Sequence, residues 1–69
     1  MERRPYRFIR LAEVQTLVGL RRTAIGDLIA AGEFPKPIAL SDSGRAKAWL
    51  EHEITAWQEA RIARGRKAA

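Results

Sequence analysis

Apolar residues recur at intervals of three and four positions in two stretches of the first half of the chain, which is the spacing of one face of an α-helix. The first stretch contains Leu11, Val14, Leu17 and Val18. Gly19 follows directly and can end the helix as a left-handed C-terminal cap. The preceding segment "RFIRL" is short and mixed in polarity, and it predicts a brief extended piece that leads into the helix.

A second helix is predicted over residues 21–31. Its inward side, at about 3.6 residues per turn, contains Ile25, Leu28, Ile29 and Gly32. The opposite side contains Thr23, Gly26, Asp27 and Ala30. Gly32 is expected to end the helix. Two helices joined by a short turn around Gly19 can cross at a steep angle, so the pattern indicates a helix-turn-helix.

The pattern changes from helical to extended after the second helix. The prolines of "EFPKPIAL" oppose helix and favour extended backbone, and the alternation of its last three residues suits a strand. The loop "SDSG" is rich in turn formers. The segment "RAKAW" then resumes an alternation that places on one face Arg45, Lys47 and Trp49. These segments predict a small hairpin with a positively charged second strand.

A third helix is predicted from about His52 to Arg64, with an apolar side that contains Leu50, Ile54 and Trp57. Gly65 is expected to end the ordered part of the chain, and the closing "RKAA" is expected to fray. The chain therefore divides into a basic arm over residues 1–6, one domain over residues 7–64 and a basic disordered tail over residues 65–69.

The aromatic residues are expected to pack in the core. Trp49 and Trp57 could stack on nucleobases, but core packing is the better account in a small domain whose aromatic residues are two Trp, two Phe and one Tyr. Phe34 and Ile38 lie beside the prolines and are expected to pin the hairpin to the helices. Phe8 is expected to pack in the same way.

Length and cysteine content limit how the fold can be stabilised. A chain of 69 residues buries only about 60% of the surface that its unfolded form exposes, so it has room for one core. It contains no cysteine, so neither disulfides nor thiolate zinc sites can support that core. No apolar run approaches the roughly 18 residues of a membrane span, and the opening "MERRPYRFIR" lacks the apolar stretch of a secretory signal. The expected location is the cytoplasm.

The net charge is +5, and the excess positive charge lies at the two ends. Residues 1–10 carry a local charge of +3, from Glu2 against Arg3, Arg4, Arg7 and Arg10. Residues 61–69 carry +4, from Arg61, Arg64, Arg66 and Lys67 without an acid. Because neutralising phosphates releases counterions, such ends on a compact body suit a polyanionic partner. A solubilising tail is the alternative interpretation.

The residue types do not favour an enzyme. Catalysis needs a nucleophile with a base, paired acids in a cleft or a metal cluster. His52 is the single histidine, and its neighbours Glu51 and Glu53 point to other sides of a helix, so they form no ligand set with it. His52 is expected to be a solvated polar residue. No cofactor, metal ion or small-molecule ligand is expected.

Basic residues at the start of the second helix and on the hairpin suit phosphate binding. A solvated charged face is the alternative for any one of them, but the helix start, the hairpin and both termini are all basic, which favours phosphate binding for the set. Arg21 and Arg22 open the second helix, where free N–H groups and the helix dipole already favour an anion. A helix of about ten residues is about 15 Å long, and the major groove of B-DNA is about 12 Å wide, so the second helix can enter it. The candidate DNA contacts are Arg10, Arg21, Arg22, Thr23, Gly26, Asp27, Lys36, Arg45 and Lys47.

Four segments of the chain resemble the AlpA family of prophage transcriptional regulators: "FIRLAEVQTLVGLRRTAI", "LIAAGEFPKPI", "GRAKAWLEHEITAW" and "RIA". They cover roughly residues 7–64, and the most specific parts are "FPKP" after a glycine-ended helix and the paired tryptophans. The resemblance implies a MerR-like winged helix-turn-helix related to phage excisionases, mainly α with a small β-hairpin, with three helices plus a wing. It also implies that residues 21–31 form the recognition helix and that the hairpin around residues 41–44 is the wing.

Three positions depart from the usual pattern of that family. Family members usually have Ser where this chain has Arg21, so the second helix loses a capping side chain at a cost of about 1 kcal/mol. They commonly have Tyr and then Arg or Lys where this chain has Gly26 and Asp27, and Gly26 costs about another 1 kcal/mol of helix stability relative to Ala. Asp27 can accept a hydrogen bond from cytosine N4. No residue three or four positions away is cationic, so we expect Asp27 to lower the non-specific affinity for DNA.

The sequence therefore predicts a regulator of prophage or mobile-element genes that binds double-stranded DNA. The second helix would enter the major groove, and the wing, residues 38–49, would contact the flanking backbone. One such domain contacts few base pairs, so a homodimer or tandem copies on DNA are expected. Two alternatives stay open: an excisionase-like architectural protein that bends DNA, and an interaction module whose DNA face has decayed and whose basic tail docks on an acidic partner.

Overall fold

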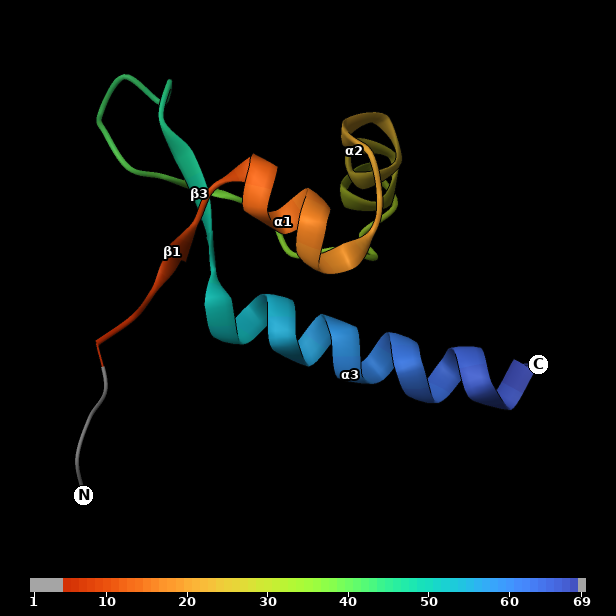
Figure 1. The fold of residues 1–69 in the computed structure, drawn as a ribbon. Helices are drawn as coiled ribbons and strands as arrows, with labels where there is room; N and C mark the ends of the chain where they lie inside the picture. Colours follow the sequence, from red (N-terminus) through yellow and green to blue (C-terminus); the bar gives the residue numbers. More distant parts are fainter. Residues whose placement is uncertain (1–4, 69) are drawn as a thin grey trace.

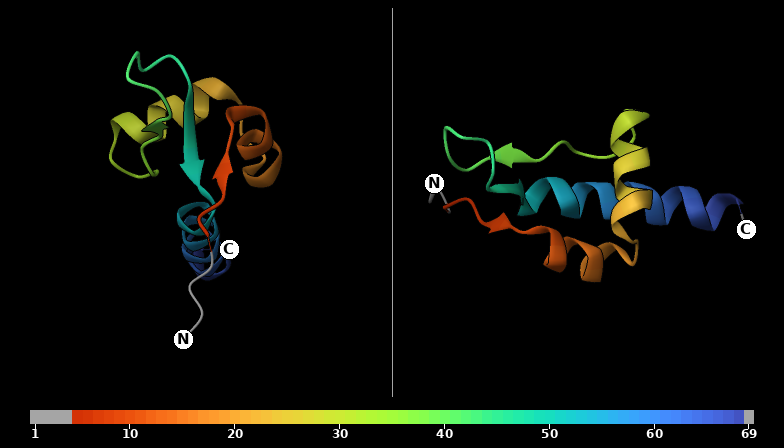
Figure 2. Two further views of the ribbon diagram at one scale, coloured as in Figure 1. Left: turned by 90° about the vertical axis from the view of Figure 1, so that its left-hand side faces the viewer. Right: turned by 90° about the horizontal axis from the view of Figure 1, so that it is seen from above.

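The computed structural model describes residues 5–68 and contains three helices and a small antiparallel sheet (Figure 1). In chain order the elements are β1 (Phe8–Ile9), α1 (Leu11–Val18), α2 (Arg22–Ala30), β2 (Ile38–Ala39), β3 (Lys47–Leu50) and α3 (Glu51–Ala68). α1 and α2 lie on one side of the sheet, and α3 runs from the end of β3 toward the same side (Figure 2). The chain is thus mainly α with a small β-hairpin, and it forms the predicted winged helix-turn-helix.

Two glycines delimit the helix-turn-helix as predicted. Gly19 has φ of 71° at the end of α1, and its N–H donates to the carbonyl of Gln15 at 2.9 Å. Gly32 has φ of 75° just after α2, and its N–H donates to the carbonyl of Ile29 at 3.0 Å. A left-handed conformation strains glycine least. These two positions therefore fix where α1 and α2 stop.

β3 is the central strand of the sheet, in the order β1-β3-β2, and it is antiparallel to both neighbours. β2 and β3 form the predicted hairpin, with Ile38 opposite Ala48. The segment predicted only as an extended piece is β1, which pairs with β3 and places Ile9 opposite Trp49. This third strand ties the beginning of the domain to the middle of the chain.

The core lies between the sheet and the helices, and it consists of buried Ile9, Val14, Ile25, Phe34, Trp49 and Ile54. Phe34 packs edge-on against Trp49 and Trp57, with ring centroids 6.4 and 4.9 Å apart. The indole N–H groups of the two tryptophans donate to the carbonyls of Pro35 and Glu33, each at 2.8 Å. The prediction that both tryptophans and Phe34 pack in the core is therefore confirmed, and their hydrogen bonds hold the segment between α2 and the wing.

The prediction that Phe8 and Ile38 pack in the core is wrong. Phe8 is 52% exposed and Ile38 is 38% exposed. Successive side chains of a strand point to opposite faces, and in β1 it is Ile9 that faces the helices. Ile38 lies opposite Ala48 and faces away from the helices with Phe8. Strands of two residues are too short for the sequence to show which face is buried.

The predicted bounds of the last helix also need correction. α3 begins at Glu51, directly after β3, so Leu50 belongs to the strand and not to the helix. α3 then continues through Gly65 to Ala68. Gly65 does not adopt the left-handed conformation of Gly19 and Gly32, and a helix tolerates such a glycine at a cost of about 1 kcal/mol. The predicted tail is therefore helical as far as the structure describes it, whereas residues 1–4 of the predicted arm and residue 69 lie outside the described residues.

Candidate nucleic-acid interface

α2 presents a face of short side chains to solvent. Its inward side packs on the core through Ile25, Leu28 and Ile29. Its outward side consists, as predicted, of the exposed residues Thr23, Gly26, Asp27 and Ala30. A Cβ atom added at Gly26 would meet nothing within 4 Å. Packing within the described part of the chain therefore does not explain the glycine at this position.

An open depression of about 500 Å³ lies beside α2, and we call it the cationic depression. Four cationic side chains from three parts of the chain line it: Arg10 before α1, Arg22 at the start of α2, and Arg45 and Lys47 of the wing. Gly26 contributes to its wall, and Ile25, Ile29 and Trp49 contribute apolar surface. No carboxylate of the described residues lines it. The fold thus gathers residues that are far apart in the sequence into one positively charged site.

The charges of this site are not compensated within the described chain. Over residues 5–68 the ion pairs within 4.0 Å both belong to Arg7, so the four cations of the cationic depression are free to meet an external anion. The helix starts add to the positive potential, because the N-cap residues Arg10 and Arg21 make no side-chain hydrogen bond that would satisfy the first N–H groups of α1 and α2. The loss of the α2 cap expected at Arg21 is therefore observed.

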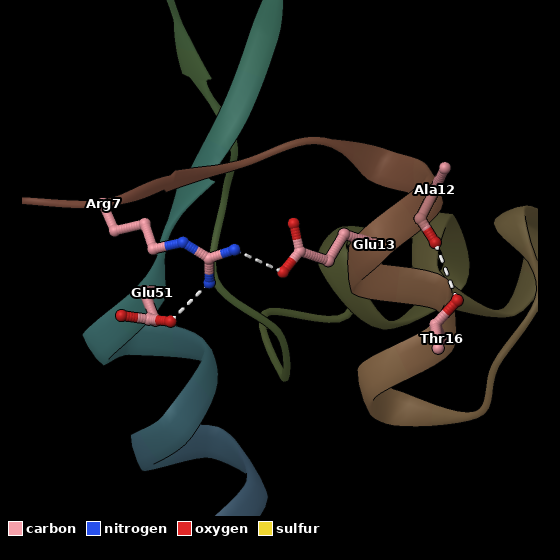
Figure 3. A network of polar contacts seen from close by, with 5 residues as sticks. All are labelled: Arg7, Ala12, Glu13, Thr16 and Glu51. Carbon is pink, nitrogen blue, oxygen red and sulfur yellow. Dashed lines mark hydrogen bonds and ion pairs between the residues drawn. The ribbon is translucent and has the colours of Figure 1, made fainter.

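Arg7 has a structural role that its place in the basic N-terminal segment did not reveal (Figure 3). Its guanidinium donates to Glu51 Oε2 at 2.6 Å and to Glu13 Oε2 at 2.8 Å. The hydrogen bonds to Glu51 and then to Glu13 raise the pKa of Arg7 further above its ordinary value. Arg7 thus joins the start of the domain to the first turns of α1 and α3, and its charge should not be counted toward a polyanion site.

Two further predicted residues lie around a neighbouring depression at the turn between α1 and α2. Arg21 and Thr23 line it together with Arg22, which also lines the cationic depression. Gln15 and Thr16 of α1 also line it. Polar and cationic side chains at the start of α2 therefore line two adjoining depressions.

Asp27 and Lys36 lie outside both depressions. Both are exposed. Asp27 sits on the outward face of α2, and no cation lies within ion-pair distance of it among residues 5–68. Lys36 stands between the two prolines of the segment that leads to the wing. The structure therefore unites Arg10, Arg22, Gly26, Arg45 and Lys47 at one site, and it leaves Asp27 and Lys36 at the edge of it.

Over residues 5–68, no three His, Asp or Glu side chains gather in a group that could hold a metal ion. His52 is exposed, as expected, and its ring lies against Tyr6 with centroids 5.5 Å apart. Among the described helices, none is both long and apolar enough to cross a membrane.

The part of the chain that contains the cationic depression is similar to known proteins. Residues 7–62 match the family described as "Prophage CP4-57 regulatory protein (AlpA)". The chain belongs to the AlpA family. A protein of Enterobacteria phage P4, "Uncharacterized protein ORF88", is 51% identical to it over 61 residues, which are 88% of this chain and 66% of the phage protein. The chain thus spans just under two thirds of that relative.

The AlpA-family match confirms the resemblance that the sequence showed. It includes α1, α2, the wing and most of α3, so every residue of the cationic depression lies inside the AlpA-family region. No solved structure matches the chain. What the depression binds therefore has to be inferred from its own geometry and charge.

Proposed function

We propose that this AlpA-family protein is a sequence-specific DNA-binding regulator of prophage or mobile-element genes that acts in the cytoplasm, without a catalytic role. The cationic depression is the observation that carries the proposal. It brings together, beside the exposed face of α2, four cations from three parts of the chain that form no ion pair among residues 5–68. Proteins bind the DNA backbone chiefly through such cations, because each neutralised phosphate releases counterions.

In this proposal α2 enters the major groove. The helix has nine residues, which gives a length of about 14 Å, and the groove is about 12 Å wide. The short side chains of its outward face let the helix backbone come close to the bases, and Gly26 allows the closest approach. Thr23 and Asp27 can form hydrogen bonds with base edges, and Asp27 is suited to the N4 amino group of cytosine.

The phosphates on either side of the groove would then meet the cationic groups around α2. Arg45 and Lys47 of the wing contact one backbone, while Arg22 and the uncapped N–H groups at the start of α2 contact another. Arg10, Arg21 and Lys36 would add further contacts. A single domain of this kind reads few base pairs, so binding as a homodimer or as tandem copies on repeated sites is part of the proposal.

The test is a pair of titrations at the same salt concentration. One uses the DNA that flanks the protein's own gene, in which a footprint locates the bound sequence, and the other uses a scrambled duplex of equal length. The proposal expects at least a 1000-fold preference for the footprinted sequence, on the order seen for specific DNA-binding proteins. Equal and micromolar or weaker affinities would contradict it and favour an interaction module that docks on an acidic protein.

A second candidate is an excisionase-like protein that bends DNA, and one observation favours it. The wing and the end of α3 lie at opposite ends of a molecule whose longest extent is 42 Å (Figures 1 and 2). The end of α3 carries Arg61, Arg64, Arg66 and Lys67. α2 and the wing lie together on one side of α3 (Figures 1 and 2), so a duplex that contacts them and also the end of α3 would have to curve around the protein. Gel shifts with circularly permuted sites distinguish the two candidates, because only a bent complex migrates according to the position of its site.

A further inference from the structure

One face of the sheet is apolar although no helix of residues 5–68 covers it. The side chains that alternate onto the side away from α1 and α2 are Tyr6, Phe8, Ile38, Leu40, Ala48 and Leu50, and we call this surface the outer sheet face. Four of the six are well exposed: Tyr6 by 69%, Phe8 by 52%, Leu40 by 40% and Ile38 by 38%. Leu50 is half-buried, and Ala48 in the central strand is fully buried. The left-hand view of Figure 2 looks toward this face, with α1 and α2 behind the sheet.

This arrangement reverses the usual pattern of an antiparallel sheet with one solvated face. Such sheets place apolar residues toward the core and polar residues toward water. Here the charged strand residue Lys47 alternates onto the same side as buried Trp49, and it lines the cationic depression together with Arg45, which precedes β3. No charged residue of β1, β2 or β3 alternates onto the outer sheet face. An exposed apolar patch that is free of charge marks an interaction surface.

We propose that the outer sheet face binds the same face of a second copy of this chain. Two copies with a net charge of +5 each repel one another wherever their basic surfaces approach. The outer sheet face is a surface on which the copies can meet without placing like charges together. A two-fold symmetric contact also pairs an apolar face with an identical apolar face, so it needs no complementary partner.

The area available indicates a weak contact in free solution. From their exposed fractions, the four side chains leave roughly 300–400 Å² uncovered on each copy. Pairing two copies would bury roughly 600–800 Å², below the about 1,200–2,000 Å² of stable interfaces. The dimer should therefore dissociate at low concentration. It should strengthen when DNA holds both copies together, because the second contact is then made at a high effective concentration.

The orientation of the two copies relative to DNA rests on the proposed function, whereas the association itself does not. A two-fold axis parallel to β3 along the outer sheet face leaves both wings on the same side of the dimer (Figure 1). The two cationic depressions would then lie on one side and could contact a single duplex. The dimer would read two half-sites related by the same axis.

Sedimentation equilibrium of the full chain without DNA tests the association. We expect the average mass to rise from 7.8 kDa toward twice that value between about 10 µM and 1 mM. Phe8→Gln should raise the concentration needed for dimerisation by about tenfold or more. Ile62→Gln is the matched control, because Ile62 on α3 is also 52% exposed and its substitution should change nothing. Leu40→Gln replaces the first variant if circular dichroism shows that Phe8→Gln does not fold.

Phe8→Gln should lower the apparent affinity for a duplex with two footprinted sites by about tenfold relative to wild type. Its affinity for a duplex with one site should stay within about twofold of the wild-type value. A single-copy mass at every concentration, together with non-cooperative binding to two sites, would overturn the proposal. Equal effects of Phe8→Gln and Ile62→Gln would also overturn it. Association through this face without any DNA binding would refute the proposed function alone.

Discussion

Arg7 and Arg45 carry the same charge but meet different partners, and this difference gives a sharp test of the phosphate contacts. Arg45 lines the cationic depression without an ion pair among residues 5–68, whereas Arg7 is held by Glu13 and Glu51. Arg45→Gln and Arg7→Gln each remove one positive charge, so the two variants have equal net charge. Only Arg45→Gln is expected to remove a contact with DNA.

The magnitude follows from the number of free cations. If each of the four cations of the cationic depression meets one phosphate, they contribute about −3.6 to the slope of log affinity against log salt, and about six contacts in total give a slope of roughly −5. Arg45→Gln should make the slope shallower by about 0.9. When salt rises from 50 to 200 mM, the factor by which the affinity of wild type falls should be about 3.5 times the factor for this variant.

Fluorescence anisotropy titrations of one labelled duplex at several salt concentrations measure both slopes. Circular dichroism of each variant, recorded under the same conditions, confirms that the protein is folded during binding. Arg7→Gln should leave the slope unchanged. If both variants reduce the slope equally, the affinity depends on net charge and not on the cationic depression, and the assignment of Arg45 to a phosphate contact is wrong. A slope near zero for wild type would remove DNA as the partner.

Three further substitutions test other parts of the account. Gly26→Ala should stabilise the protein by about 0.5–1 kcal/mol in urea unfolding, because the added methyl group meets nothing within 4 Å; a loss of stability would contradict the helical reading of this position. Asp27→Asn should tighten binding to random DNA by removing an anion from the α2 face, and unchanged or weaker binding would count against that role. Trp49→Phe should lower the free energy of unfolding by about 1–3 kcal/mol, because the carbonyl of Pro35 loses the indole donor at 2.8 Å; chemical denaturation measures the change, and an unaltered midpoint would show that this hydrogen bond contributes nothing.

Local features of the fold could be predicted from the sequence because neighbouring residues determine them. Gly19 and Gly32 end α1 and α2 since a left-handed residue is needed just after each helix. The inward and outward sides of α2 follow from its helical period alone. The core positions of the tryptophans follow from their size in a domain with few other large side chains.

Features that depend on residues distant in the sequence could not be predicted in the same way. The pairing of β1 with β3 and the ion pair between Arg7 and Glu51, 44 positions apart, leave no periodic pattern. The exposure of Phe8 follows from that pairing, because the partner strand decides which side of β1 is covered. At the candidate site, the sequence indicated the cations one by one, but only the fold shows that Arg10 joins Arg22 and the wing residues while Arg7 is neutralised.

The central claim is that α2 and the wing contact DNA together, and chemical-shift mapping tests it most directly. An ¹⁵N-labelled sample is titrated with the footprinted duplex, and the backbone amide signals are followed residue by residue. We expect the amides of residues 22–30 and 45–47 to shift, with the largest changes at the start of α2 and at the second strand of the wing. Amides over both segments that stay unmoved while the duplex binds elsewhere would contradict the account.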